Sequence, residues 1–368
     1  MGKKVIENWE LGIGNNSFPF PITHYPLPIT HYQIAMLVRD IGEQGLLERL
    51  QRFCPPEIIG DDAAVLVTKP GQSLVVTTDV LVDGVHFSEI TTSAEDAGWR
   101  AAAANLSDLA AMGASPLGIT VGLGLPGEVS VSWVEELYQG ITQCLQKYNT
   151  SIVGGDVVRS PVTTISITAF GQAHPHQIIR RNQAQVGDAI VVTGVHGASG
   201  AGLELLLHPE SGQNLTLGAR MALIRAHQRP QPRLDVLPIL WEILSSSPLL
   251  SIAGMDSSDG LADAVLQICR RSGVGAVLES TRIPLPDAFN YWLTKEKALL
   301  YALYGGEDFE LVLCLPSLLA DALVQQLGNG AAIVGTITSG SKVILHDQNE
   351  KNPDQVLTLN RGFQHFGQ

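Results

Sequence analysis

The stretch SAEDAGWRAAAANLSDLAAMGA, residues 93–114, carries the strongest structural signal in the sequence. Ser93 is a helix-capping residue with Asp96 three positions later, a pairing typical of the start of a helix. Gly113 stands where a helix commonly ends in a left-handed turn. The alanines at 101–104 leave little bulk on the helix surface, so a sheet can approach it closely. We therefore expect one long, buried helix packed against a sheet.

The same stretch places a carboxylate on the buried side of the expected helix. Asn105 and Asp108, three residues apart, share a face with Leu109 and Met112. An ionised carboxylate among apolar side chains is costly unless a cation or hydrogen-bond donors meet it. Asp108 is therefore a candidate functional residue, although an exposed Asp, or one that caps a neighbouring loop, fits the same pattern.

The composition is that of a globular and strongly acidic chain. Its 368 residues are enough for two domains, and 45% of them are hydrophobic. The formal net charge of −13 argues against nucleic acid or an anionic membrane as the main partner. A protein this acidic needs divalent cations between its carboxylates and any polyphosphate ligand.

The cysteines and the hydropathy indicate the compartment. Cysteines occur far apart in the sequence and form no C-x-x-C pair, at Cys54, Cys144, Cys269 and Cys314. This spacing indicates neither a zinc site nor a disulfide framework. No apolar run reaches the roughly 18 residues that a membrane-spanning helix needs. We expect reduced cysteines in the core of a cytoplasmic protein.

Strand-like and helix-like segments alternate in both halves of the chain, which predicts an α/β fold (α+β type) with two mixed α/β domains. We place the domain boundary near residue 178, where a polar segment that contains Pro precedes a strong strand. Residues 31–178 are the expected N-terminal domain and residues 179–368 the C-terminal domain. Residues 1–30 are rich in Pro, Gly and Asn, and we interpret them as an N-terminal extension, either an extended arm or a poorly ordered tail.

Two local segments give definite structural predictions. Residues 63–68 and 74–79 are strand-like runs joined by the turn Lys69-Pro70-Gly71, which predicts a β-hairpin. The segment GVHGASGAG, residues 194–202, follows a strand and opens a helix. Its glycines allow either phosphate binding at the helix N-terminus or tight packing of helix on strand.

Acidic residues recur beside Gly, Ser or Thr at expected turn positions. The segments are Gly60-Asp61-Asp62, Thr77-Thr78-Asp79, Gly154-Gly155-Asp156, Asp256-Ser257-Ser258-Asp259-Gly260 and Gly305-Gly306-Glu307-Asp308. Each segment alone is ordinary turn chemistry. Together they offer hard oxygen ligands that suit Mg²⁺, an ion commonly shared with substrate phosphates. The glycines would let backbone N–H groups approach a phosphate closely.

Familiar nucleotide-binding and hydrolase motifs are missing from the sequence. It has no G-x-x-x-x-G-K-[ST] P-loop and no G-x-S-x-G nucleophile elbow. Residues 122–127 match G-x-G-x-x-G, but Pro126 and the distance to the next helix fit a dinucleotide-binding loop poorly. Neither His86 nor His196 has a Ser and a carboxylate at a recognised triad spacing.

The acidic segments, taken with Gly84-Val85-His86-Phe87 and the helix around Asp108, resemble the thiamine-monophosphate kinase family in order and spacing over roughly residues 32–366. The resemblance implies two α/β domains of the kind typified by aminoimidazole ribonucleotide synthetase. It also implies that ATP and several magnesium ions lie between these domains. A homodimer formed through the N-terminal domain is a further implication.

The resemblance also assigns roles to individual residues. The residues that it implies as magnesium ligands are Asp62, Thr77, Thr78, Asp79, Asp108, Asp156, Asp256 and Asp259. Among these, the implied catalytic residues are Asp79, Asp108 and Asp156. Contacts with ATP are implied for Gly155, Arg181 and Ser258, and contacts with thiamine phosphate for His86, Glu307 and Phe363. Arg100 stands where the family often has Lys, and Phe363 where Tyr or Trp is common.

The expected activity is ATP- and Mg-dependent phosphorylation of thiamine monophosphate to thiamine diphosphate by direct in-line transfer. The acceptor is itself a phosphate, whose second pKa is about 6, so it needs no general base near neutral pH. Bound Mg²⁺ would bring the two anions together. Three alternatives stay open at this point: another ATP-using enzyme of the same fold, a non-catalytic nucleotide-binding protein, and a metal-dependent phosphatase.

Overall fold

Helix α2, Ala94–Ala111, has both of the ends that the sequence predicts. The Ser93 side chain accepts a hydrogen bond from the backbone N–H of Asp96 at 3.1 Å. Gly113 has a φ of +73°, in the left-handed region that stops a helix. Ala101 and Leu106 on the inner face are completely buried. The prediction of a long, buried helix is confirmed.

The computed structural model describes residues 35–56, 58, 63–247, 250–328, 330–347 and 353–361, all within one compact unit of the chain. The N-terminal extension expected at residues 1–30 lies outside the described residues, as do the predicted site residues Asp62 and Phe363. Within the described ranges, no helix has the length and apolar composition needed to cross a membrane.

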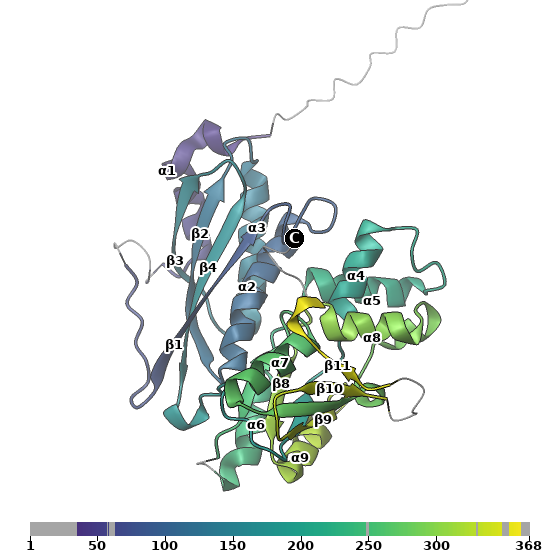
Figure 1. The fold of residues 1–368 in the computed structure, drawn as a ribbon. Coiled ribbons are helices and arrows are strands. Elements are labelled where there is room, and N and C mark those ends of the chain that lie inside the picture. Colours follow the sequence, from purple (N-terminus) through teal and green to yellow (C-terminus); the bar gives the residue numbers. More distant parts are fainter. Residues whose placement is uncertain are drawn as a thin grey trace, which may run out of the picture. The chain divides into compact units, whose positions relative to one another are not determined.

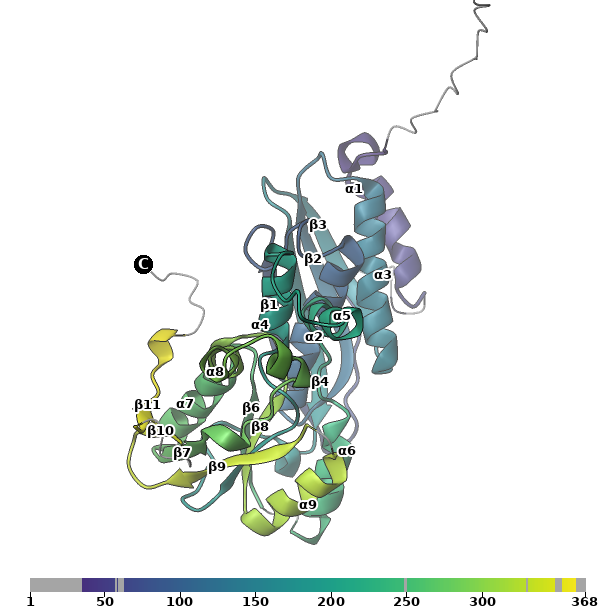
Figure 2. The same ribbon diagram turned by 90° about the vertical axis from the view of Figure 1, so that its right-hand side faces the viewer.

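The first half of the described chain forms a four-stranded sheet in the order β1-β4-β2-β3 (Figure 1). Its strands are β1 Ser73–Val82, β2 Ser115–Leu125, β3 Ile152–Arg159 and β4 Thr164–Ala173. β4 is antiparallel to both β1 and β2, whereas β2 and β3 are parallel. α2 and α3, Val131–Lys147, cover one face of the sheet, and α1, Val38–Leu50, lies alongside α3 (Figure 2). None of the described helices covers the opposite face.

The predicted hairpin at residues 63–68 and 74–79 is wrong. Residues 63–68 form no strand, and Val65 and Val67 are 85% and 80% exposed. β1 pairs instead with β4, with Val75 opposite Gly171. The alternation of residues in β1 was a correct strand signal, but alternation does not identify the partner strand, which here lies far away in the sequence.

The turn expected at Gly154-Gly155-Asp156 is also wrong, because these residues lie inside strand β3. Gly155 is opposite Val121 and Asp156 opposite Gly122 in the parallel pair of β3 with β2. A Cβ atom on Gly155 would lie 2.2 Å from the carbonyl oxygen of Val121, so glycine is required by a close approach of two strands.

The second half of the described chain forms a seven-stranded sheet in the order β11-β10-β7-β9-β5-β8-β6. Its strands are β5 Ala189–Val192, β6 Ala253–Asp256, β7 Gly275–Glu279, β8 Leu311–Leu315, β9 Ala332–Thr338, β10 Val343–His346 and β11 Gln355–Val356. Its helices are α4 Ala198–Leu207, α5 Leu217–Gln228, α6 Val236–Ile243, α7 Leu261–Ser272, α8 Lys295–Tyr304 and α9 Ser317–Leu327. Short 3-10 turns are Gln51–Phe53, Pro175–Gln177, Leu244–Ser246, Ser280–Arg282, Asp287–Tyr291 and Leu359–Arg361. The predicted α/β fold is confirmed.

Helix α2 touches elements of both sheets and so joins the two halves. The indole N–H of Trp99 donates to the carbonyl of Pro230 at 2.7 Å. Ser107 donates to the carboxylate of Asp256, at the end of β6, at 2.6 Å. The C-terminal alanines of α2 pack in one apolar cluster with residues of α6 and α9. Side chains from both halves therefore meet along α2.

Candidate active site

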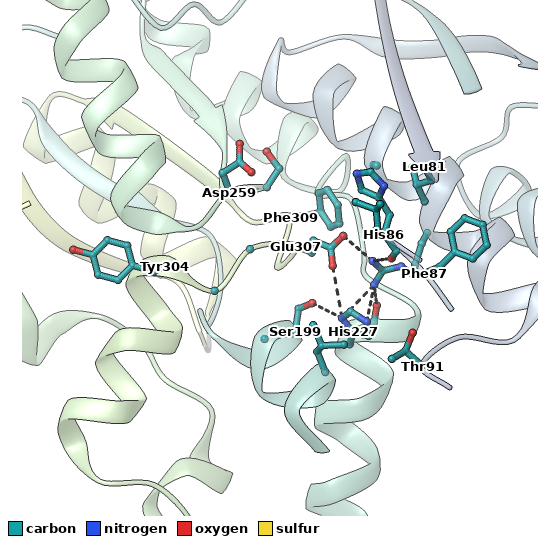
Figure 3. A pocket seen from close by; sticks show the side chains of 18 of the residues that line it. Leu81, His86, Phe87, Thr91, Ser199, His227, Asp259, Tyr304, Glu307 and Phe309 are labelled. Atoms are coloured by element: carbon teal, nitrogen blue, oxygen red, sulfur yellow. Dashed lines mark hydrogen bonds and ion pairs between the residues drawn. The ribbon is translucent and has the colours of Figure 1, made fainter. Parts of the chain in front are cut away.

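A cavity of about 1180 Å³ lies beside α2 and takes its lining from both halves of the chain (Figure 3). The predicted site residues that line it are Thr78, Asp79, His86, Asp108, Asp256, Ser258, Asp259 and Glu307. These residues come from β1 and the loop after it, from α2, from the end of β6 and the loop after it, and from the loop before β8. The structure thus brings together most of the residues that the sequence analysis selected, although Thr78 and Glu307 are 229 positions apart in the sequence.

One side of the cavity, which we call the acidic wall, consists of Asp79, Asp108, Asp256 and Asp259. Burial raises the pKa of Asp79 to about 7, and the charges of the other wall carboxylates, first that of Asp108, add to the rise. Burial likewise raises the pKa of Asp256 to about 6, again with a contribution from Asp108. Because these carboxylates repel one another, and all but the exposed Asp259 are at least partly buried, a bound cation would be strongly stabilised there.

Hydrogen bonds fix the orientation of the acidic wall. Thr77 donates to Asp108, and Ser258 donates to the second carboxylate oxygen of Asp256 at 3.0 Å. Asn105 accepts from the backbone N–H of Asp79 at 3.2 Å, which ties β1 to α2. The expectation that Asp108 needs a partner on the buried face of α2 is confirmed by the Thr77 hydroxyl. None of the ion pairs between described residues involves Asp79, Asp108 or Asp256.

The donor set of the acidic wall fits magnesium better than a metal held by protein alone. Across the residues with described positions, no three His, Cys, Asp or Glu side chains are grouped closely enough to hold an ion. Magnesium typically takes one or two carboxylates and completes its octahedron with water and substrate phosphates. The separated, oxygen-only ligands of the acidic wall match that pattern.

The opposite side of the cavity, which we call the arginine wall, consists of Arg100, His227 and Glu307. The guanidinium of Arg100 is 2% exposed and lies 2.6 Å from the Glu307 carboxylate. Burial lowers the pKa of His227 to about 3, and the charge of Arg100 adds to the fall, so His227 is neutral near pH 7. In Figure 3, Glu307, His227 and His86 lie on one side of the cavity, and Asp259 and Tyr304 lie on the other.

Some predicted residues lie elsewhere. Gly155 and Asp156 are on β3, at the opposite edge of the sheet from β1, and do not line the cavity. Three strand spacings separate them from Asp79, roughly 14 Å. Arg181 does not line the cavity either, but its charge partly offsets the rise that burial causes in the pKa values of Asp108 and Asp256. Arg361, two residues before Phe363, does line it.

The sequence predicted either phosphate binding or tight helix packing for the glycine-rich segment at residues 194–202. The structure shows tight packing. A Cβ on Gly202 would lie 2.1 Å from the carbonyl of Leu223, so α4 and α5 are in close contact there. The backbone N–H groups of Gly197 and Ser199, at the start of α4, donate to the Asp308 carboxylate at 2.5 and 2.9 Å. The anion at this helix N-terminus is thus a side chain of the same protein.

The sequence analysis missed His227 and gave Arg100 no role. A charged residue directly before the alanine run of α2 was an available signal for Arg100, because such a residue is buried only with a partner. His227 offered no local signal, since it acquires its neighbours only when α5 packs against α2.

The chain matches two family models. Residues 60–173 match the AIR synthase related protein, N-terminal domain, and residues 185–348 match the AIR synthase related protein, C-terminal domain. Together these models account for most of the chain.

The curated relatives at 33–51% identity are thiamine-monophosphate kinases, and solved structures of the same family are similar to this chain. The thiamine-monophosphate kinase of Synechococcus elongatus is 51% identical over 327 residues, which cover 89% of this chain and 97% of the relative. The crystal structure of thiamine-monophosphate kinase from Stenotrophomonas maltophilia is 34% identical with a TM-score of 0.72, covering 83% of this chain and 96% of that one. AaThiL complexed with AMPPCP and TMP is 30% identical with a TM-score of 0.65, covering 88% and 99%. The resemblance inferred from the motifs is confirmed, and the chain belongs to the thiamine-monophosphate kinase family.

Proposed function

We propose that the protein transfers the terminal phosphoryl group of ATP to thiamine monophosphate and so forms thiamine diphosphate. The observation that carries the proposal is the cavity in which carboxylates from β1, α2 and β6 face the buried pair of Arg100 and Glu307. Family membership supports it, since a relative at 51% identity is named thiamine-monophosphate kinase and another was solved with AMPPCP and TMP.

The acidic wall would hold magnesium, with Asp79 and Asp108 as its central residues. The further proposed ligands are Asp62, Thr77, Thr78, Asp156, Asp256 and Asp259. Bound magnesium would neutralise the phosphate charges and allow two anions to approach for in-line transfer. The chain's own part is to hold these oxygens rigidly, as the bonds from Ser107 and Ser258 to Asp256 do.

The reaction requires little acid–base chemistry from the protein. Thiamine monophosphate carries a phosphate that is mostly dianionic near pH 7, since its second pKa is about 6. Its oxygen can therefore attack without a general base. Among the described residues that line the cavity, the imidazoles are those of His86 and His227.

The remaining proposed contacts divide between the two substrates. Gly155, Arg181 and Ser258 would contact ATP, and Arg181 supports this by its electrostatic effect on Asp108 and Asp256. His86 and Glu307, together with Phe363, would contact thiamine monophosphate. His86 and Glu307 both line the cavity.

We propose that residues 31–178 form the domain that binds ATP and magnesium and forms the dimer, and that residues 179–368 complete the site. The separate sheets built from residues 73–173 and 189–356 support this division. We also propose a cytoplasmic location, because Cys54, Cys144, Cys269 and Cys314 are all free thiols, as a reducing compartment favours.

The uncovered face of the first sheet supports the proposed homodimer. Leu74, Val76 and Val80 alternate along β1 with exposures of 54%, 51% and 46%, on the face away from α2. Exposed apolar side chains in such a row commonly mark an interface. Two four-stranded sheets related by a two-fold axis could close with β1 of one subunit beside β3 of the other. That arrangement would bring Asp156 of one subunit toward Asp79 of its partner.

Mixed dimers test the shared site. Asp79→Asn and Asp156→Asn subunits carrying different tags are co-expressed, and the heterodimer is purified through both tags. If each site uses Asp79 from one subunit and Asp156 from the other, both substitutions fall in one site of the heterodimer and the other site is intact. The heterodimer should then show about half the wild-type turnover. Activity no higher than that of either mutant homodimer would contradict a shared site.

The proposed reaction is tested by ³¹P NMR of the purified protein with ATP, Mg²⁺ and thiamine monophosphate. The proposal predicts ADP and thiamine diphosphate signals that require the acceptor. Phosphate release without acceptor would favour a phosphatase, and ATP binding without turnover would favour a non-catalytic protein. Turnover that ignores thiamine monophosphate would point to another ATP-using enzyme of the same fold.

A further inference from the structure

Arg100 connects the two residues proposed to contact the acceptor. One terminal nitrogen of its guanidinium donates to the carbonyl of His86 at 3.1 Å and to the carboxylate of Glu307 at 2.6 Å. The other terminal nitrogen donates to the carbonyl of His227 at 2.6 Å. A single side chain of α2 thus holds the loop after β1, the end of α5 and the loop before β8. His86 and Glu307 are 221 positions apart in the sequence and share this one cation.

The charges around Arg100 are balanced within the protein. A guanidinium that is 2% exposed is costly unless an anion meets it. Within the described part of the chain, Glu307 is its ion-pair partner, and the Glu307 side chain is still 34% exposed, toward the cavity. Although burial raises the pKa of Glu307, the charge and hydrogen bond of Arg100, together with His227 and His86, outweigh this effect and the net shift is downward. Arg100 therefore keeps a carboxylate ionised at the cavity surface.

The backbone that carries Glu307 is strained. Glu307 and Phe309 have φ values of 68° and 53°, which non-glycine residues rarely adopt. Such conformations cost on the order of 1–3 kcal/mol each and persist only where the surroundings enforce them. The backbone N–H of Glu307 donates to Ser258 at 2.7 Å, and the Asp308 carboxylate binds the start of α4. Arg100 supplies the constraint on the Glu307 side chain itself.

His227 completes the enclosure of Arg100 without adding charge. Its carbonyl belongs to the last turn of α5, where carbonyl groups lack helical partners and favour a cation. Its ring nitrogen Nδ1 lies 3.1 Å from the hydroxyl of Ser199. A neutral imidazole therefore fills the space beside the guanidinium and leaves Glu307 as the group that neutralises it.

We propose that Arg100 is a positioning residue that sets the affinity of the site for its acceptor, by holding His86 and Glu307 at a fixed separation across the two halves of the chain. The inference rests on the proposed function, because it assumes that these two residues contact thiamine monophosphate. Arg100 itself acts through them: its side chain is only 2% exposed where it lines the cavity, whereas that of Glu307 is 34% exposed, so Glu307 offers the acceptor far more surface than the arginine does.

The test is steady-state kinetics of Arg100→Met with each substrate varied in turn. We expect the KM for thiamine monophosphate to rise about tenfold or more, because the Glu307 carboxylate and the His86 carbonyl lose the guanidinium that holds them in place. The KM for ATP should stay within about twofold. In a Glu307→Gln background the same substitution should add clearly less than about tenfold, because only the bond from Arg100 to the His86 carbonyl is left to lose. Additive effects, or equal rises in both KM values, would overturn the proposal.

Arg229→Met is the matched control. Arg229 also joins the end of α5 to α2, through Glu95 at 2.7 Å and Asp96 at 2.5 Å, but it contacts neither His86 nor Glu307. Its loss should lower stability while leaving the acceptor KM within about twofold. An acceptor KM raised as much as in Arg100→Met would show that any link between α2 and α5 suffices, against the proposal.

Arg100→Lys keeps the test decisive if Arg100→Met fails to fold. Lysine retains the charge but places it on one nitrogen, which cannot serve the three acceptors in the geometry of the guanidinium fork. We expect an acceptor KM raised about threefold with the ATP KM unchanged. A lysine variant with wild-type acceptor KM would overturn the proposal. Failure of wild-type protein to form thiamine diphosphate would instead refute the underlying function, so the two failures are distinguishable.

Discussion

The acidic wall and the arginine wall of the cavity differ in how their charges are balanced. The carboxylates of the acidic wall raise one another's pKa values, and a cation is needed to relieve their repulsion. The arginine wall is neutral as it stands, because Arg100 pairs with Glu307 and His227 is uncharged. This contrast supports our proposal that metal and phosphates bind at the first wall and the organic part of the acceptor at the second.

The largest effect should come from breaking the acidic wall. Asp108→Asn removes one negative charge and one oxygen ligand while keeping the size of the side chain. We expect turnover to fall at least about 10²-fold, because electrostatic stabilisation of the phosphates is lost. The measurement is kcat at saturating ATP and thiamine monophosphate.

Asp188→Asn is the control for this substitution. Asp188 is another carboxylate whose pKa burial raises, but it lies outside the cavity and accepts from the backbone of Gln185 at 2.8 Å. It should retain wild-type turnover. Near-normal turnover of Asp108→Asn would contradict the proposed role of the acidic wall in stabilising the phosphates.

A substitution in the arginine wall should have a different kinetic signature. Glu307→Gln leaves Arg100 without its anion, and we expect the KM for thiamine monophosphate to rise about tenfold with a smaller change in kcat. His86→Ala should act in the same direction. The KM values for both substrates are measured in each variant, and a loss confined to kcat would contradict a binding role for these residues.

The neutral histidine of the arginine wall predicts an acid-sensitive stability. The pKa of His227 is lowered in the folded state to about 3, from an ordinary value near 6.5. Between these two pKa values the unfolded chain binds a proton at His227 and the folded chain does not. The free energy of unfolding is therefore unaffected by this group above pH 6.5 and falls as the pH is lowered from 6.5 toward 3. Between pH 7.5 and 5.5 this group should cost about 1.4 kcal/mol.

The pH effect is measured by denaturant unfolding of wild type and His227→Asn at pH 7.5 and 5.5. The variant should lose less stability on acidification than the wild type. His208→Asn, which alters an exposed histidine, is the control and should behave like the wild type. An equal loss in all three proteins would show that His227 does not stay neutral in the folded state.

The smallest effect should come from the start of α2, which serves both walls. Ser93→Ala removes the side-chain acceptor for the Asp96 backbone N–H and should lower the free energy of unfolding by about 1 kcal/mol. Neither KM should change, because Asp108 and Arg100 lie more than a turn away from the cap. Chemical denaturation and kinetics on the same preparation check both statements.

The elements that were correctly predicted carry their signals within a few residues. α2 begins at a capping Ser and ends before a glycine with positive φ, and Asp108 was conspicuous on its apolar face. The failures share the opposite property. The partner of β1 is β4, about ninety residues away, and nothing in the local alternation of residues identifies it.

The candidate site was also predicted in part, and again the residues found were those with a signal in the local sequence. Short acidic motifs identified the residues of the acidic wall, because oxygen ligands and glycines are visible in the sequence itself. Glu307 was predicted too, but its pairing with Arg100 became visible only in three dimensions, since the two residues are 207 positions apart. Asp156, selected by its motif, lies on the far edge of the sheet, which a single sequence does not indicate.

The magnesium concentration that gives half-maximal rate should be measured for wild type, Asp108→Asn and Glu307→Gln at saturating ATP and thiamine monophosphate. If the acidic wall holds the metal and the arginine wall does not, as we propose, the value should rise at least about tenfold in Asp108→Asn and stay within about twofold in Glu307→Gln. A magnesium requirement that shifts equally in both variants, or only in Glu307→Gln, would contradict the division of the cavity into a metal-binding wall and an acceptor-binding wall.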